Sequence, residues 1–141
     1  MTSEQIALVQ SSFEKIRPIA SVAGAMFYSR LFQLDESLKH LFKGDKTEQQ
    51  RKLMATLEIM AKGLSVQEVI LPTLRELGKR YAGYGVEPQH YATVGSALLW
   101  TLEKGLGEDF TPAVKEAWTE AYGLIASVMQ EAAAEAADAA N

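Results

Sequence analysis

The most informative segment of the chain reads Phe27-Tyr28-Ser29-Arg30-Leu31-Phe32. Apolar residues recur through it and on both sides of it with the spacing of one helix face. That face carries Val22, Met26, Phe27, Leu31 and Leu34. The pattern predicts an amphipathic helix that follows Pro18. Ordinary core packing explains such a stripe, so this helix taken alone reveals no function.

The helical period continues along the rest of the chain. Thr2 with Gln5 and Thr47 with Gln50 have the spacing of capping boxes. All four prolines stand where a helix could begin, and no hairpin dipeptide occurs. The sequence predicts an all-α domain over residues 1–141, with a loop at 43–46 and a frayed alanine-rich tail at 131–141. The helices are predicted at 2–16, 19–34, 35–42, 47–64, 69–81, 88–104 and from 111 onwards.

Composition narrows the class of protein. A chain of 141 residues is the size of one domain. The absence of cysteine excludes disulfides, zinc-thiolate sites and iron–sulfur clusters. A net charge of −4 without a basic stripe argues against nucleic acid. Charge-free runs such as 18–29 are too short for a membrane span of about 20 residues, and the N-terminus does not resemble a signal peptide. We therefore expect a soluble, cytoplasmic protein.

Short motifs do not assign an activity. His40 and His90 stand fifty residues apart, so neither belongs to a helical zinc motif. No phosphate-binding loop, dinucleotide fingerprint or nucleophile elbow is present. On motifs alone, this is a helical domain of unknown function.

Five strings in order nevertheless resemble the globin family, in particular bacterial single-domain haemoglobins and flavohaemoglobins. They are Phe27–Phe32, Leu41-Phe42, Gln49–Met54, Tyr84–Gly95 and Ala117–Gly123. The resemblance covers residues 3 to 130 and implies a globin fold of about seven to eight helices around haem b. It also implies a small residue at Gly24, where two helices cross closely.

The resemblance assigns roles by position. Tyr28 and Gln49 fall on the distal side, where a phenol and an amide donate hydrogen bonds to an iron-bound diatomic ligand. Lys52 reaches a haem propionate, and Tyr81 takes the place of the iron ligand. The residues implied to bind the cofactor are Tyr28, Phe32, Phe42, Gln49, Lys52, Leu53, Leu77, Tyr81, Val86, Tyr91 and Val94. Two alternatives stay open: Tyr28 as a core tyrosine with a satisfied hydroxyl, and Gln49 as an exposed residue.

The proximal position departs from the family pattern, because Tyr81 stands where the iron-binding histidine is expected. Tyr81 could ligate iron as a phenolate, as in catalase. Haem could instead bind without it, or the domain could have lost haem. The resemblance places the glutamate that supports the family's histidine near Ala133, with Glu131 two residues away, and if it is absent the network that activates the histidine is absent too. His90 and His40 are expected to be surface or capping residues.

The resulting interpretation is a haem-binding globin that takes a diatomic gas, either oxygen, NO or CO. An external reductase is a possible partner, and the chain is expected to be a monomer or homodimer. Two alternatives remain: a haem-free sensory or interaction module, and a ferric tyrosinate-haem enzyme acting on peroxide or NO.

Overall fold

The fold of the chain was obtained as a computed structural model, which describes residues 1–42 and 44–140. Lys43, in the predicted loop 43–46, and Asn141, at the end of the predicted tail, lie outside the described residues. The described part is all-α, as predicted, and holds six α-helices and four short 3₁₀ helices. In order they are α1 (Ser3–Ile16), η1 (Arg17–Ile19), α2 (Ala20–Leu34), η2 (Glu36–His40), α3 (Lys46–Gly63), η3 (Leu64–Val66), α4 (Gln67–Gly83), α5 (Pro88–Leu106), η4 (Gly107–Asp109) and α6 (Pro112–Ala140).

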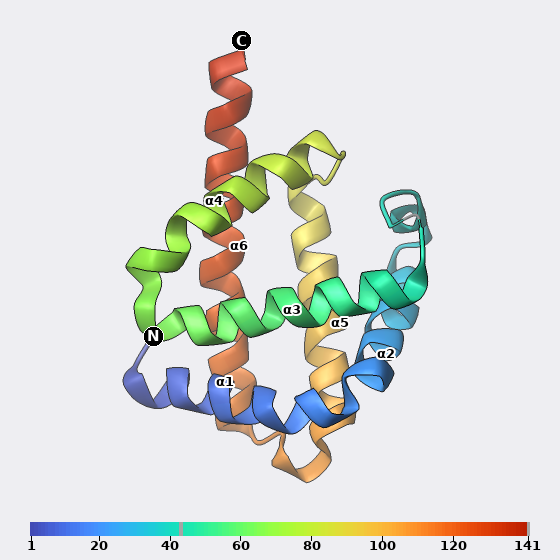
Figure 1. Ribbon diagram of the computed structural model, residues 1–141, viewed down its shortest axis with the longest axis vertical. Helices are drawn as coiled ribbons and strands as arrows, with labels where there is room; N and C mark the ends of the chain where they lie inside the picture. The colour runs from blue at the N-terminus through green and yellow to red at the C-terminus, as the bar shows by residue number, and fades with distance from the viewer. Residues whose placement is uncertain (43, 141) are drawn as a thin grey trace.

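Figure 1 shows α1, α3 and α4 running across the two long helices α5 and α6. The most extensive packing joins α4 to α6, α2 to α5 and α1 to α6. A buried hydrogen bond ties the last pair together, because the Trp118 indole N–H donates to Ser12 Oγ at 2.8 Å. None of the described helices has an apolar stretch long enough to cross a bilayer.

The helix starts show which local signals dominate. The predicted capping box of Thr2 and Gln5 is confirmed, with both reciprocal hydrogen bonds present. The predicted box at Thr47 is wrong. Asp45 caps α3 instead, because it directly precedes Lys46, the first residue of the helix. Its carboxylate accepts a hydrogen bond from the Thr47 N–H at 2.9 Å.

The prolines follow the prediction with one exception. Pro88 and Pro112 are the first residues of α5 and α6, and Pro18 lies in η1. Pro72 lies inside α4 rather than at its start. The reason is that η3 leads directly into α4, so the helix begins at Gln67, before the predicted Val69.

The close approach expected at Gly24 is confirmed. A Cβ built there would lie 2.9 Å from Gln50 Cβ, so α2 and α3 cross without room for a side chain. Gly78 likewise permits a close crossing of α4 and α6, because an added Cβ would lie 2.7 Å from Met129 Cα. These two crossings fix the helices on which the predicted site residues stand.

The C-terminal segment differs from the predicted frayed tail. Helix α6 continues through the segment and extends beyond α4 (Figure 1). Ala132 is fully buried, and Glu135 forms an ion pair with Arg75 of α4. Packing against α4 therefore holds the first half of the segment, and fraying of its last residues stays a prediction.

Candidate functional site

An aromatic group lies where α2 meets the end of η2. The Tyr28 and Phe42 rings are 5.5 Å apart, and Phe32 lies 6.1 Å from Tyr28 and 6.2 Å from Phe42. All three side chains are half-buried. They come together because Tyr28 and Phe32 stand one turn apart on α2 and because η2 returns the chain to this helix. The structure thus groups three predicted site residues on one wall.

Gln49, in the first turn of α3, contacts this group through its backbone. The Tyr28 hydroxyl donates to the Gln49 carbonyl oxygen at 3.2 Å. The Gln49 side chain is half-buried, and its Nε2 is buried without a hydrogen-bond partner among the described residues. A buried amide nitrogen in that state costs free energy and is rare in folded proteins. The alternative in which Gln49 is simply exposed does not hold.

The neighbouring residues of α3 divide between core and solvent. Leu53, one turn after Gln49, is half-buried and packs against the larger of two apolar clusters. Lys52 is exposed. Leu53 can therefore contact an apolar ligand, whereas Lys52 can reach only the solvent-exposed edge of such a ligand.

The opposite wall comes from α4 and the start of α5. Leu77, Tyr81 and Tyr91 pack against a second, smaller apolar cluster of Ile70, Leu74, Ile125 and Met129. The half-buried Val86 follows α4 in the chain, and its N–H donates to the Tyr81 carbonyl oxygen at 3.0 Å. Val94, one turn beyond Tyr91, packs against the larger cluster. The interior is therefore divided between two apolar clusters with predicted site residues on both.

The phenols of Tyr28 and Tyr81 both have raised pKa values. Burial, and to a smaller extent the charge that Tyr81 would carry when ionised, raises the pKa of Tyr28 from 10 to about 12. Burial likewise raises the pKa of Tyr81, although Arg80 opposes the shift. Burial exceeds the influence of Arg80, so the Tyr81 phenol stays protonated in the absence of a nearby cation.

The histidines lie away from these walls. His40 is exposed, and His90 caps α5, its Nδ1 accepting from the Glu87 N–H at 2.9 Å. The described residues hold no cluster of three His, Asp or Glu side chains suited to a metal ion. Ala133, where the family's supporting glutamate was expected, is half-buried on α6. Tyr81 therefore has no carboxylate partner from that position.

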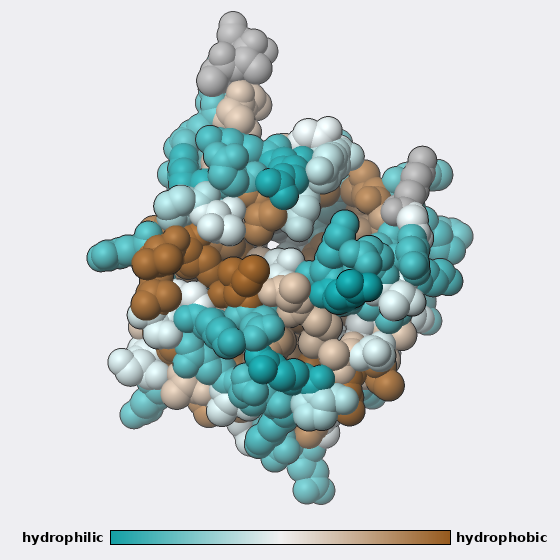
Figure 2. Space-filling view, in the orientation of Figure 1, coloured by the Kyte–Doolittle hydropathy of each residue, from teal (hydrophilic) through white to brown (hydrophobic). Residues whose placement is uncertain are grey.

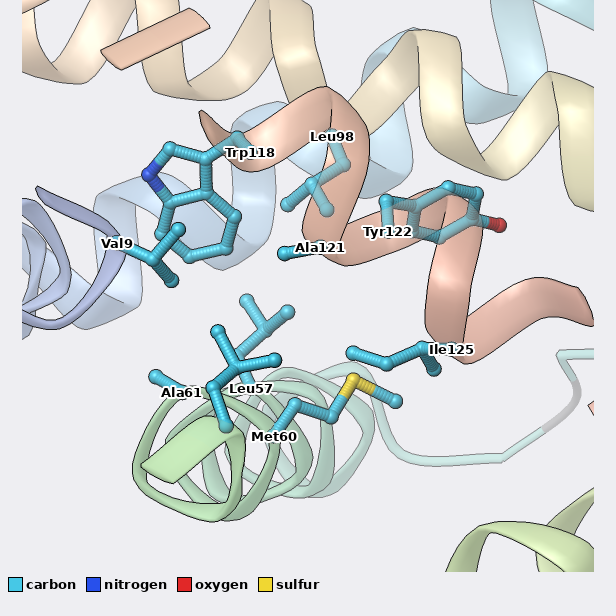
Figure 3. Close-up of a pocket in the computed structure, with 10 residues that line it drawn as sticks. Val9, Leu57, Met60, Ala61, Leu98, Trp118, Ala121, Tyr122 and Ile125 are labelled. Atoms are coloured by element: carbon cyan, nitrogen blue, oxygen red, sulfur yellow. The ribbon is translucent and has the colours of Figure 1, made fainter. Parts of the chain in front are cut away.

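Figure 2 shows a hollow in the surface between α3 and α4. A separate enclosed cavity of about 10 Å³ lies deeper, where α1, α3, α5 and α6 meet (Figure 3). Its lining is almost entirely apolar, with Leu57, Met60, Trp118 and Ile125 among the residues that form it. None of the predicted site residues lines this cavity. Its size barely admits one water, so it is a packing void rather than the site.

Sequence reasoning missed two features near the walls. Tyr84 is 63% exposed, and its ring lies 6.3 Å from that of Tyr81. Arg30 has a buried Nε without a partner among the described residues, and its guanidinium lies 5.3 Å from the Trp100 ring. The i, i+3 spacing of Tyr81 and Tyr84 at a helix end could have revealed the first contact. No local signal pointed to the second, which joins α2 to α5.

Comparisons with known proteins agree with this geometry. A family model described as Globin matches residues 25–129. The chain is 28% identical to the flavohemoprotein of Bacillus subtilis over 131 residues, which cover 89% of this chain and 32% of that protein. It is 26% identical to the neuroglobin of Tetraodon nigroviridis, covering 92% and 90% of the two chains. It also superposes on a bacterial globin from Campylobacter jejuni with a TM-score of 0.85, at 24% identity and 97% and 99% coverage. The chain thus spans about a third of the length of the flavohemoprotein.

Proposed function

The chain belongs to the globin family, and we propose that it holds haem b in the hollow between α3 and α4. In this proposal a diatomic gas, either oxygen, NO or CO, binds on the side of Tyr28 and Gln49. Residues 1–141 act as one globin domain, and an external reductase keeps the iron ferrous.

The observation that carries the proposal is the unpartnered Gln49 Nε2. A buried donor without an acceptor costs roughly 1–3 kcal/mol, a penalty that a bound ligand with a partly negative oxygen would remove. Tyr28 adds a phenol close to Gln49, because its hydroxyl donates to the Gln49 backbone carbonyl oxygen. An amide and a phenol are the donor types that stabilise charge developing on a bound diatomic ligand.

The residues around the hollow fit haem. Both walls are apolar and half-buried, as a porphyrin face requires, with Phe42 and Leu53 on one side and Leu77 and Tyr91 on the other. In this proposal the half-buried Phe32, Val86 and Val94 complete the apolar lining, and the exposed Lys52 pairs with a propionate. When bound, haem supplies an iron that accepts one axial ligand from the protein and one from solution.

Tyr81 is proposed as that axial ligand. A phenolate is an established ligand of haem iron. Burial raises the pKa of Tyr81, so its deprotonation depends on the charge of a bound metal. A hard anionic ligand favours ferric iron, and for this reason a second candidate function is turnover of peroxide or NO.

The haem-free alternative has its own supporting observation. The Tyr28 hydroxyl already has an acceptor in the Gln49 carbonyl, so the distal phenol does not need a ligand to be satisfied. In that case the fold would serve as a sensory or interaction module.

The absorption spectrum of the purified protein tests the proposal directly. After haem is added, we expect a Soret band that shifts when the protein is reduced with dithionite and exposed to carbon monoxide. A ferric charge-transfer band that disappears in Tyr81→Phe would assign Tyr81 to the iron. No Soret band under saturating haem would refute haem binding and favour the haem-free alternative.

A further inference from the structure

Three exposed aliphatic side chains gather where α3, η3 and α4 meet. Ile59 on α3 and Val66 in η3 are each 52% exposed, and Val69 in the first turn of α4 is 73% exposed. Figure 2 shows a brown area over this corner of the molecule, at the left of the view. We call these three residues the apolar patch. An exposed group of this kind, bordered by polar residues, is typical of an interaction surface.

The local backbone explains why these side chains share one surface. Gly63 and Leu64 keep a right-handed helical conformation, so α3 passes into η3 without a break. Ile59 and Val66 are seven residues apart and therefore lie on the same helix face. The chain leaves the helical conformation at Val66, and α4 presents Val69 three residues later.

The core beneath the apolar patch is already filled. Leu64 and Ile70, which are neighbours of the patch in the chain, are buried, with exposed fractions of 4% and 8%. A Cβ built on Gly63 would lie 2.9 Å from Ile70 Cβ, so η3 and α4 leave no room for further side chains here. The apolar patch is therefore a surface in addition to the core, and only a second molecule can remove it from water.

Charged side chains of both signs border the apolar patch. The Lys62 ammonium, on the α3 side, lies 2.8 Å from the Glu58 carboxylate, and the Lys62 side chain is 66% exposed. Glu68, on the α4 side, directly precedes Val69 and is exposed. A two-fold axis through the apolar patch places Lys62 of each copy opposite Glu68 of the other, so this surface is complementary to itself. A partner with a single sign of charge would gain attraction at one border and meet repulsion at the other.

We propose that the apolar patch is the centre of a two-fold interface with a second copy of this chain. Val66 and Val69 of the two copies pack together, and this burial drives the association. The pairs of Lys62 with Glu68 close the contact at both ends and fix the two-fold arrangement. The inference goes beyond the proposed function and does not depend on haem, because none of the predicted site residues belongs to the apolar patch.

The extent of the apolar patch argues for a reversible dimer. Specific interfaces bury about 800 Å² on each partner, with an apolar centre and a polar rim. Three aliphatic side chains supply the centre only, and the rim comes from polar residues of the same elements, such as Ser65 and Gln67. We therefore expect a dimer that dissociates on dilution.

Sedimentation equilibrium of the full chain tests the interface. We expect the wild-type chain to pass from monomer to dimer as its concentration rises. Val69→Lys should raise the Kd of the dimer at least about tenfold, because a two-fold interface contains each substituted side chain twice. Ile59→Lys should act in the same direction, which guards against a fold defect in one variant.

Val22→Lys is the matched control. Val22 is 58% exposed on α2, close to Gly24, which packs against the start of α3, whereas the apolar patch lies at the end of that helix. The same substitution there should leave the Kd of the dimer unchanged. An equal loss of dimer in Val22→Lys and Val69→Lys would show that general surface charge governs association, and it would overturn the proposal.

Charge reversal tests the two-fold arrangement. Lys62→Glu and Glu68→Lys should each abolish dimer at concentrations where the wild-type chain dimerises, because like charges then meet at both ends of the contact. A mixture of the two variants should form a heterodimer, since opposite charges are restored at both ends. A mixture that stays monomeric would overturn the arrangement. A wild-type chain that is monomeric at every concentration, or a dimer unaffected by Val69→Lys, would overturn the interface and leave the apolar patch to a different partner.

Discussion

Replacing Gln49 by leucine should stabilise the haem-free protein, although it removes a polar residue from the candidate site. The buried Nε2 has no partner among the described residues, and such a donor costs roughly 1–3 kcal/mol. Glutamine and leucine have similar helix propensities, so the backbone contribution nearly cancels. We expect Gln49→Leu to raise the free energy of unfolding by about 1 kcal/mol. For a chain of this length, that corresponds to roughly 2–4 °C in Tm.

Gln10→Leu is the matched control, because the same substitution should have the opposite sign there. The Gln10 Nε2 donates to the Ala61 carbonyl and to Ser65 Oγ, each at 2.9 Å. Loss of both hydrogen bonds should cost about 1–2 kcal/mol. Urea unfolding followed by circular dichroism measures both variants. If Gln49→Leu loses as much stability as Gln10→Leu, then the Gln49 amide has a partner and the reasoning is refuted.

In the reduced, haem-loaded protein, Gln49→Leu should act against function. The variant lacks the amide donor that the proposal assigns to the bound ligand, so oxygen should dissociate faster. Loss of a hydrogen bond worth about 1.4 kcal/mol corresponds to roughly a tenfold increase in the rate of oxygen dissociation. Stopped-flow oxygen release measures it, and an unchanged rate would remove Gln49 from the ligand site.

Two further predictions concern packing and ionisation. Gly78→Ala should lower the free energy of unfolding by about 1–2 kcal/mol, because its Cβ would meet the Met129 backbone and overpacking exceeds the gain in helix propensity. Gly123→Ala, in open space on α6, should instead stabilise by roughly 0.5–1 kcal/mol in the same urea titration, and equal effects at the two sites would contradict the packing argument. Burial and Tyr81 raise the pKa of Tyr28 from 10 to about 12, so its contribution to stability is complete below pH 10 and is lost as pH rises toward 12. Tyr28→Phe should flatten that part of the pH–stability curve, and an unchanged curve would show that Tyr28 does not titrate there.

Much of the fold could be predicted because its signals are local. The Thr2–Gln5 capping box was readable from local spacing and is confirmed, and the glycine at Gly24, which the family resemblance implied, is confirmed as well. The start of α3 was missed because Asp45, two residues before Thr47, is the stronger capping residue and was assigned to the loop. Local sequence did not reveal the pairing of Arg75 in α4 with Glu135, sixty residues away in the chain.

The sequence by itself determined the all-α class, most of the helices and the family pattern, because periodicity, capping and motif order are properties of neighbouring residues. The family pattern also predicts that Tyr81 stands where the iron-binding histidine is expected. Only the tertiary structure decided which buried polar atoms lack hydrogen-bond partners and which tyrosine rings lie close together. The buried Gln49 Nε2 and the contact of Tyr28 with the Gln49 carbonyl depend on how α2 crosses α3. Burial and hydrogen-bond satisfaction arise between helices distant in the chain, so local sequence carries no record of them.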